Sequence, residues 1–160
     1  RKKQAQQAVT DVRRLVYGLR PPALDDLGLR GALYEETLRF EEKGLQVAFE
    51  APDPLPALPA AVEVAAYRIV QEALTNAAKH GDGTATLTTE WNRETFAITV
   101  TNPSPTVPDT PADPTSGHGL VGMRERAVAN GGSLEAGPTP TGFAVRARLP
   151  VPPQPDEVGR

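Results

Sequence analysis

Four polar side chains recur along one predicted helix at a spacing that could serve a metal ion and a polyphosphate. They are Arg68, Glu72, Asn76 and Lys79, separated by steps of four, four and three residues. In an α-helix these steps place side chains one above another along a single face. The oxygens of the carboxylate and the carboxamide are ligands of the kind that Mg²⁺ prefers. The row also fits an ordinary solvated helix face with i,i+4 pairing, so alone it leaves both interpretations open.

The residues around this row predict the helix that carries it. Apolar side chains recur at helical spacing and indicate one buried face over about 59–80. Gly81 follows directly and is a typical helix stop. The apolar positions are Val62, Ala66, Ile69, Val70, Ala73, Leu74 and Ala77.

A second stretch could bind an anion through its backbone. Gly117-His118-Gly119 leads directly into a predicted helix at about 119–130, which Gly131-Gly132 ends. Backbone N–H groups at such a helix start can approach an anion closely, and the helix dipole favours negative charge there. Glycine suits the position because a Cβ would stand between the backbone and a phosphate. The turn is neither a Walker A loop nor a Rossmann fingerprint, and by itself it is weak evidence.

The composition excludes several classes of site and partner. The 160 residues carry a net charge of −3, which gives no support for a nucleic-acid or membrane-surface partner. The absence of cysteine excludes disulfides, thiol chemistry and Cys-based zinc sites, and two histidines are too few for a His-rich metal site. No apolar run approaches the roughly twenty residues that cross a bilayer. We therefore expect a cytoplasmic fragment, whose parent protein could be membrane-anchored.

Residues 4–20 also predict a helix, and its long apolar stripe needs a cover. Pro21-Pro22 cannot continue this helix and ends it. Two structures could cover this apolar stripe. One is a partner helix, from the parent protein or a second copy, and the other is the domain that follows. The chain begins with Arg1 rather than Met, inside the helical pattern, so we expect a fragment of a longer protein.

The remaining segments predict an α+β fold with helices on one face of a mixed or antiparallel sheet. A helix is expected at about 27–43, with Asp25 or Asp26 placed to cap it and Gly44 placed to end it. Residues 102–117 form a proline-rich loop, and so long a loop inside a compact domain is usually functional or disordered. Alternating runs predict strands at 45–49, 84–91, 94–101, 133–136 and 143–149, the last four as two hairpins.

Together, the two polar stretches resemble the N box and the G2 box of bacterial sensor histidine kinases, in the branch related to nitrate sensors and the membrane-fluidity thermosensor. The resemblance covers about residues 5–150. It implies the Bergerat ATP-binding fold, a two-layer α/β sandwich shared with gyrase and the heat-shock chaperone ATPases, preceded by a long helix. It further implies part of the dimerisation bundle at 1–22, a catalytic ATP-binding domain at 23–150 and a flexible tail at 151–160.

The resemblance assigns roles to individual residues. Asn76 matches the asparagine whose amide oxygen binds the Mg²⁺ that bridges the phosphates of ATP. Glu72 matches the acidic residue proposed to act as a base or to hold a metal-bound water. Lys79 and His80 match positions near the phosphates or the lid, although His80 also fits a helix C-terminal cation that interacts with the dipole. The lid residues that would contact the nucleotide are Gly117, His118, Gly119, Leu120, Gly122 and Met123.

Two departures from the family pattern concern the adenine end of the site. Asn102 stands where the family has an aspartate that accepts a hydrogen bond from the adenine amino group, and a neutral acceptor makes a weaker bond. The flanking glycines are replaced, with Pro103 and Pro105 nearby. Gly142-Phe143 stands where the family often has Gly-Thr. Adenine binding is therefore expected to be weak or to use different contacts.

The resemblance implies a histidine kinase that transfers the γ-phosphoryl group of ATP to a histidine and thence to a response-regulator receiver domain. Because the only histidines, His80 and His118, match the ATP site, we expect the acceptor histidine upstream of this fragment. The intact protein would form a homodimer through its helical bundle. One alternative is a degenerate, non-catalytic interaction module, which Asn102 and Phe143 favour. Another is a serine kinase of the anti-sigma type, which the helix ending at Pro21-Pro22 argues against.

Overall fold

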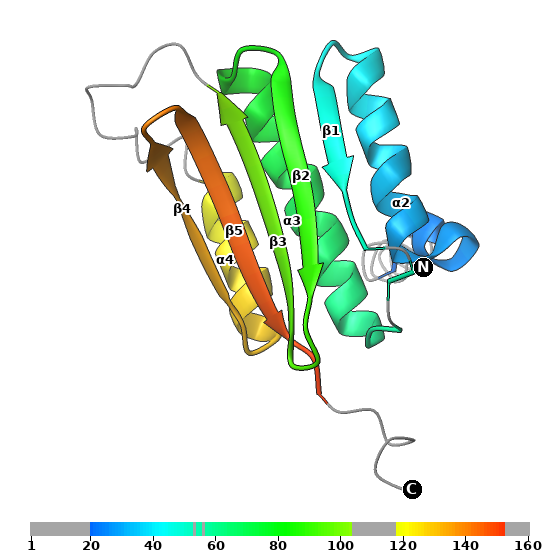
Figure 1. Cartoon of the computed structure of the whole chain (residues 1–160). Coiled ribbons are helices and arrows are strands. Elements are labelled where there is room, and N and C mark those ends of the chain that lie inside the picture. Colours follow the sequence, from blue (N-terminus) through cyan, green and yellow to red (C-terminus); the bar gives the residue numbers. More distant parts are fainter. Residues whose placement is uncertain (1–19, 53, 56, 104–117, 153–160) are drawn as a thin grey trace, which may run out of the picture.

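The computed structural model describes residues 20–52, 54–55, 57–103 and 118–152. Its five strands form one mixed sheet, and the described helices cover one face of that sheet (Figure 1). The predicted α+β fold is confirmed, whereas the helix expected at 4–20 lies outside the described residues. The elements are α2 (Pro22–Glu42), β1 (Gln46–Glu50), α3 (Ala60–His80), β2 (Thr84–Trp91), β3 (Thr95–Pro103), α4 (His118–Ala129), β4 (Ser133–Thr139) and β5 (Gly142–Pro150).

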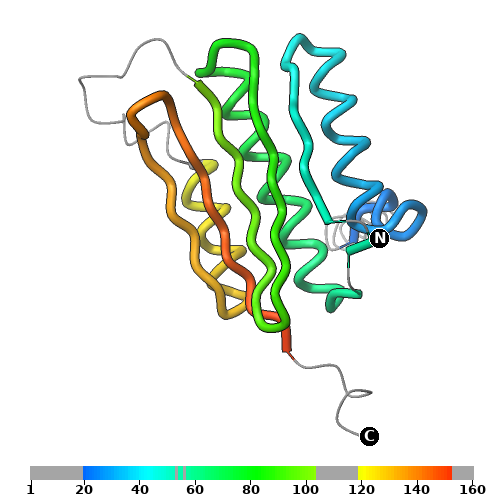
Figure 2. The backbone as a smooth tube through the Cα atoms, viewed as in Figure 1, coloured from blue at the N-terminus to red at the C-terminus, as the bar shows by residue number. Residues whose placement is uncertain are grey.

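The sheet has the strand order β1-β2-β3-β5-β4, in which β1 and β2 are parallel and all other pairs are antiparallel. The chain crosses from β1 to β2 through α3, and two hairpins supply the other strands (Figure 2). Side chains alternate along each strand, because successive residues point to opposite faces. In β3, for example, Phe96, Ile98 and Val100 are buried in the core, whereas Ala97 and Thr99 between them are only partly buried.

α3 is the central helix and forms where the apolar spacing predicts it. It packs against α2 on one side and α4 on the other, and it lies across β2, β3 and β5. No helix in the described part of the chain is both long and apolar enough to span a membrane. The buried residues of α3 are Val62, Ala65, Ala66, Tyr67, Ile69, Val70, Ala73, Leu74 and Ala77.

α2 differs from the predicted helix at its start. It begins at Pro22 without a side-chain cap, so the expectation that Asp25 or Asp26 caps it is wrong. Asp25 instead forms an ion pair with Arg20, with 2.5 Å between Nε and Oδ1. Gly28 interrupts the helix at φ 72°, a backbone conformation that glycine adopts without strain. The sequence pattern missed the first turn because a proline suits the first helical position as well as it suits a helix end.

Glycines end α2 and α4 as predicted. Gly44 follows the last turn of α2 at φ 98°, and Gly131 follows α4 at φ 77°. After α4, the N–H of Gly131 donates to the carbonyl of Val128, and the N–H of Gly132 donates to the carbonyl of Ala127. These two bonds form a Schellman motif, which satisfies carbonyl groups that the helix end would otherwise leave unpaired.

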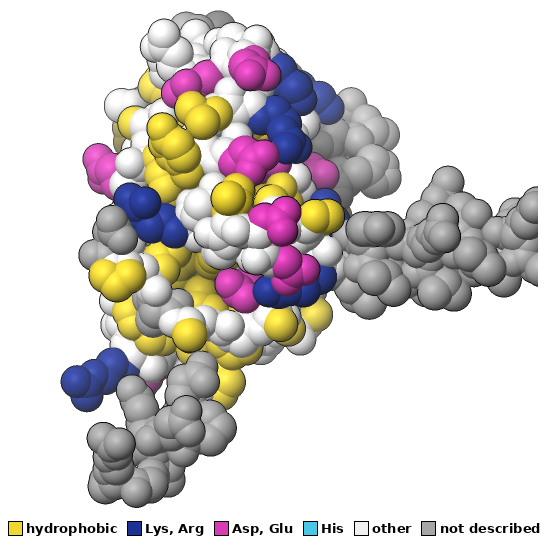
Figure 3. All heavy atoms as spheres, turned by 90° about the vertical axis from the view of Figure 1, so that its right-hand side faces the viewer, with side chains coloured by type: hydrophobic (Ala, Val, Ile, Leu, Met, Phe, Trp, Pro, Cys, Tyr) yellow, Lys and Arg dark blue, Asp and Glu magenta, His cyan; other side chains and the backbone are white. Residues whose placement is uncertain are grey.

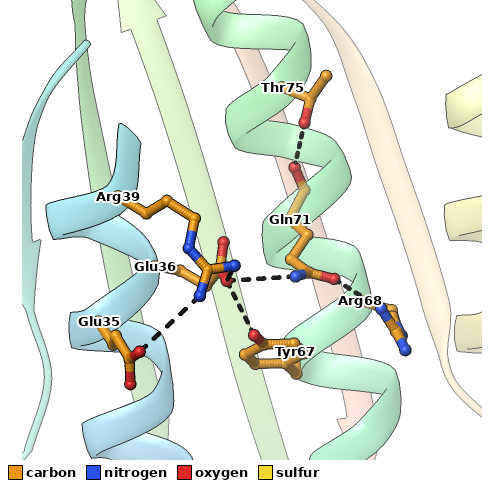
Figure 4. Close-up of polar contacts among 7 residues, drawn as sticks. All are labelled: Glu35, Glu36, Arg39, Tyr67, Arg68, Gln71 and Thr75. Carbon is orange, nitrogen blue, oxygen red and sulfur yellow. Dashed lines mark hydrogen bonds and ion pairs between the residues drawn. The ribbon is translucent and has the colours of Figure 1, made fainter. Parts of the chain in front are cut away.

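A buried carboxylate fixes how α2 lies against α3 (Figure 4). Glu36 of α2 accepts hydrogen bonds from the Tyr67 hydroxyl at 2.8 Å and from the Gln71 amide at 3.3 Å, and Arg39 Nη1 lies 3.0 Å away. A buried charge is tolerated when it is paired and hydrogen-bonded in this way. Burial and the hydrogen bond to Glu36 raise the pKa of Tyr67 to about 12. The network therefore fixes the register of α2 on α3.

The turn after α4 generates a test of the fold. A Cβ on Gly132 would lie 2.0 Å from the carbonyl oxygen of Arg148, a backbone atom that cannot move aside cheaply. We expect Gly132→Ala to destabilise the domain by about 2 kcal/mol or more, because β5 must shift. Gly137→Ala is the matched control, since nothing lies within 4 Å of a Cβ there. Urea unfolding of both variants measures the difference, and equal midpoints would contradict the prediction.

Candidate functional site

The start of α4 lies directly against the polar face of α3. A Cβ on Gly119 would stand 3.0 Å from Oε2 of Glu72, 3.5 Å from Nδ2 of Asn76 and 3.8 Å from Oδ1 of Asn76. No larger residue fits there without moving one of these groups. The structure thus brings together the two stretches that the sequence singled out, although more than forty residues separate them in the chain.

Glu72 and Asn76 are available for a ligand. Glu72 is exposed and Asn76 is half-buried, on successive turns of α3. Within the described residues, neither side chain has a hydrogen-bond or ion-pair partner, so their oxygens are free to bind one. The same part of the chain holds no group of three or more His, Cys, Asp or Glu side chains that could form a metal site alone. A single carboxamide oxygen suits Mg²⁺, which keeps several waters and takes its other ligands from substrate phosphates.

The polar row on α3 divides into two parts with different surroundings. Arg68 donates a hydrogen bond at 3.0 Å to Oε1 of Gln71, which in turn contacts the Glu36 network (Figure 4). This end of the row belongs to the contact with α2. Lys79 and His80 are exposed in the last turn of α3, where a cation is favoured by the helix dipole. The part of the row that faces α4 is therefore Glu72 and Asn76.

The two residues that depart from the family pattern are direct neighbours in the sheet. Asn102 of β3 pairs with Phe143 of β5 in the antiparallel ladder. Directly opposed residues of such a ladder have Cβ atoms about 4.5–5.5 Å apart, so these two side chains leave the sheet side by side on the same face. Asn102 is only 7 % exposed. Its side chain is thus nearly buried, whereas Phe143, its partner in the ladder, is only partly buried.

Gly81 has a second role that the sequence did not reveal. Its backbone is extended, at φ −90° and ψ −171°, so it does not end α3 through a left-handed conformation. A Cβ at this position would lie 2.7 Å from the carbonyl oxygen of Ala77 and 2.8 Å from Nδ2 of Asn102. Glycine is needed because the end of α3 approaches Asn102 closely. A glycine directly after the last helical residue is consistent both with a helix stop and with a close approach of another chain segment, so the sequence alone did not distinguish them.

The predicted lid residues have different positions. Gly117 and the side chain of His118 lie outside the described residues, and His118 begins α4. Leu120 is half-buried and packs partly on the core. A Cβ on Gly122 would meet nothing within 4 Å, so no close contact requires a glycine there. Met123 is fully buried in the core, and we therefore assign its side chain to anchoring α4 rather than to ligand contact.

Comparison with known proteins identifies the family. The model of the histidine kinase-, DNA gyrase B- and HSP90-like ATPases matches residues 61–153, more than half of the chain. The histidine-protein kinase/phosphatase DegS of Brevibacillus brevis is 35% identical over 135 residues, which cover 83% of this chain and 35% of DegS. The histidine-protein kinase/phosphatase UhpB of Salmonella typhimurium is 33% identical over 126 residues, which cover 77% of this chain and 25% of UhpB. The chain thus spans about a third or less of these relatives.

A solved structure supports the same fold. The nucleotide-free catalytic domain of histidine kinase ThkA superimposes with a TM-score of 0.63, covering 79% of this chain and 95% of that domain. At 19% sequence identity this likeness concerns the fold alone. The matching family model, the relatives and the contact between the two polar stretches agree. The chain belongs to the family of histidine kinase-, DNA gyrase B- and HSP90-like ATPases, and within it to the ATP-binding catalytic domains of sensor histidine kinases.

Proposed function

We propose that this domain binds Mg·ATP between α3 and the start of α4, and that the intact protein transfers the γ-phosphoryl group to a histidine outside this fragment. The contact of Gly119 with Glu72 and Asn76 carries the proposal. It joins an oxygen ligand for a metal to a helix start whose N–H groups favour phosphate. The chemistry is then positioning and charge neutralisation, as in other phosphoryl transfers.

Each group has a distinct role in this proposal. Mg²⁺ bound to the Asn76 oxygen would neutralise charge on the phosphates. Glu72, one turn earlier, accepts a proton or orients a water at the reacting end. The N–H groups of Gly119 and its neighbours donate to phosphate oxygens, Lys79 adds positive charge at the end of α3, and the His80 ring offers a further hydrogen-bond donor there. Asn102 accepts a hydrogen bond from the adenine amino group through its amide oxygen.

The proposal extends to the parent protein. A response-regulator receiver domain would take the phosphoryl group, and residues 1–22 would join the bundle through which two copies dimerise. The catalytic unit would be residues 23–150, with residues 151–160 as a tail, in a cytoplasmic position. A non-catalytic interaction module is the second candidate, because Asn102 and Phe143, which pair in the sheet, leave the proposed adenine end less polar than the family pattern.

The first test removes the metal ligand. We expect Asn76→Ala to weaken Mg·ATP binding by more than tenfold, or about 1.4 kcal/mol, because alanine supplies no oxygen for Mg²⁺. Thr75→Ala is the control, since the Thr75 hydroxyl bonds the carbonyl of Gln71 within the helix. Calorimetric titration with ATP, with and without EDTA, measures the affinity of both variants. Equal affinities for the two variants in the presence of Mg²⁺ would refute the role of Asn76, and no binding by the unmodified domain at millimolar ATP would favour the interaction module.

The second test fills the contact between α4 and α3. Gly119→Ala places a methyl group 3.0 Å from Glu72 Oε2, so the carboxylate or the start of α4 must move. We expect ATP affinity to fall about fivefold, or roughly 1 kcal/mol, with little loss of stability because Glu72 is exposed. Val128→Ala, which shortens a 60% exposed side chain on α4, should bind ATP as tightly as the unmodified domain. A loss of the same size in both variants would indicate a general effect on α4.

The third test concerns the adenine end. We expect the double variant Asn102→Asp/Phe143→Thr to bind ATP about tenfold more tightly than Phe143→Thr alone. A charged acceptor strengthens the hydrogen bond to the adenine amino group, and the threonine gives that carboxylate a polar neighbour. Affinity for GTP, which lacks this amino group, should not rise. An unchanged ATP affinity would show that Asn102 is not the purine contact.

A further inference from the structure

A groove lies between α2 and the edge strand β1. It has a volume of about 350 Å³ and opens on the side of the molecule shown in Figure 3, where hydrophobic side chains gather between acidic and basic ones. Tyr34 and Leu38 of α2 are 52% and 42% exposed on this side. We call it the α2 groove. It is lined by Arg30, Tyr34, Leu38 and Glu41 of α2 and by Val47 and Phe49 of β1.

The backbone of β1 offers hydrogen-bonding groups to this groove. In the described sheet β1 pairs only with β2, so its other edge is open. The N–H of Gln46 donates to the carbonyl of Gly83 at 2.9 Å, on the β2 side. Backbone groups alternate between the two edges of a strand, so those of Ala48 also point to β2 and those of Val47 and Phe49 point away from it. Within the described residues, the outward N–H and C=O groups of Val47 and Phe49 have no hydrogen-bond partner.

The two edges of the sheet differ in how they are protected against pairing. Edge strands commonly carry a proline, a lysine or a bulge, which keeps other strands from adding to the sheet. β4, the edge at the opposite end, contains Pro138, which has no N–H to donate. β1 contains neither proline nor lysine, and its register with β2 is continuous. β1 is therefore the edge that is suited to accept a strand.

The side chains of β1 specify which strand would fit. Val47 is buried and Phe49 is half-buried, whereas the other three residues of β1 are exposed. The ring of Phe49 lies 6.3 Å from the ring of Tyr34, measured between centroids. A residue directly opposite Val47 or Phe49 would point to the same face of the sheet, toward Tyr34 and Leu38. The groove thus fits an extended segment with apolar side chains at two alternate positions.

The two ends of the groove carry opposite charges. Cζ of Arg30 lies 5.9 Å from the centroid of the Phe49 ring, so the positive charge is near the end of β1. Glu41 is in the last turn of α2, so the negative charge is near the start of β1. Antiparallel pairing is the more stable kind, and it would bring the N-terminal flank of a segment to Arg30 and its C-terminal flank to Glu41. An acidic residue before the apolar pair and a basic residue after it are therefore favoured.

A second copy of the domain does not fit this edge, and neither does the connection that follows β1. α2 packs on β1 at the outer end of the sheet (Figure 1). Two copies joined through β1 would place their α2 helices about one strand spacing apart, roughly 5 Å, whereas packed helices need about 8–10 Å. The connection after β1 has proline at positions 52, 54, 56 and 59, so it lacks donors that a paired strand needs. The occupant must come from elsewhere.

We propose that the α2 groove binds an extended segment of another protein, which adds to the sheet as a strand antiparallel to β1. Backbone hydrogen bonds to Val47 and Phe49 hold the segment, and two apolar side chains at alternate positions pack against Tyr34 and Leu38. The segment carries an acidic residue before this pair and a basic residue after it. The surface includes none of the residues assigned to ATP, so its tests are independent of the ATP-binding proposal.

Hydrogen exchange tests the open edge residue by residue. In the unmodified chain without a partner, we expect the amides of Val47 and Phe49 to exchange about tenfold faster, or more, than those of Ala48 and Glu50, which donate to β2. NMR measures all four rates. Protection of Val47 and Phe49 that rises with protein concentration would indicate pairing between copies. Protection at every concentration would indicate a cover from the chain itself, and either result would overturn the proposal.

A synthetic peptide supplies the added strand. The probe is acetyl-Glu-Thr-Ile-Thr-Val-Thr-Lys-amide, whose third and fifth residues would lie opposite Phe49 and Val47. N-methylation of the third residue removes its donor to the carbonyl of Phe49. N-methylation of the fourth residue, whose N–H would point away from β1, is the matched control. We expect the first modified peptide to bind about tenfold more weakly than the second in an NMR titration. Equal affinities, or no binding of the unmodified peptide at millimolar concentration, would overturn the proposal.

The same titration tests the wall that α2 provides. We expect Tyr34→Ser/Leu38→Ser to bind the unmodified peptide about tenfold more weakly than the unmodified chain does, because the apolar contacts are lost. Val128→Ser removes a 60% exposed apolar side chain from α4 and is the control. The amides of Val47 and Phe49 should also become protected when the peptide binds to the unmodified chain. Equal affinities of the double variant and the control, or binding without this protection, would overturn the proposal.

Discussion

The fold depends on α3, which has one buried apolar face and one partly exposed polar face. Nine of its residues are buried against the sheet and the neighbouring helices, while the turns that carry Glu72 and Asn76 leave these two polar side chains at least partly exposed. Burial of an aliphatic side chain contributes about 1.5–3 kcal/mol, so the apolar stripe holds the helix in place with a large margin. This margin is what permits two unpaired polar side chains on the adjacent face. α4 then needs only a glycine at its start to lie against them.

The Glu36 network shows a second use of polarity at the same helix. A carboxylate that is 3% exposed receives a phenol, an amide and a guanidinium, all from α2 and α3. Such a cluster adds less stability than apolar packing of the same volume, but removal of one partner leaves a buried charge uncompensated. Its effect is therefore to select one register of α2. The same register orients the exposed face of α2, with Tyr34 and Leu38, away from the core.

The sequence predicted the elements that have a clear period and missed features that depend on distant contacts. The apolar stripe from Val62 to Ala77 was sufficient to predict α3, and the alternation in β3 was sufficient to predict that strand. Burial of one face imposes a period of 3.6 residues on a helix and of 2 residues on a strand. The kink at Gly28 could not be predicted, since the pattern on both sides of it remains helical. The close approach of Gly81 to Asn102 depends on where β3 ends beneath α3. The burial of Met123 followed from the packing of α4 on α3, whereas its place in a Gly-rich motif suggested a ligand contact.

The two residues that depart from the family pattern, Asn102 and Phe143, have one common explanation. Asn102 and Phe143 oppose each other in neighbouring strands, and Asn102 is nearly buried. A carboxylate at this nearly buried position would lose most of its hydration, which costs free energy unless a cation or a hydrogen-bond donor replaces the water. A neutral carboxamide avoids the cost and still offers an acceptor oxygen. Conversely, a hydroxyl at position 143 has less to stabilise once the neighbouring charge is gone. The partly buried phenylalanine then contributes apolar burial at the end of the sheet, so the pair favours stability of the domain over polarity at this edge.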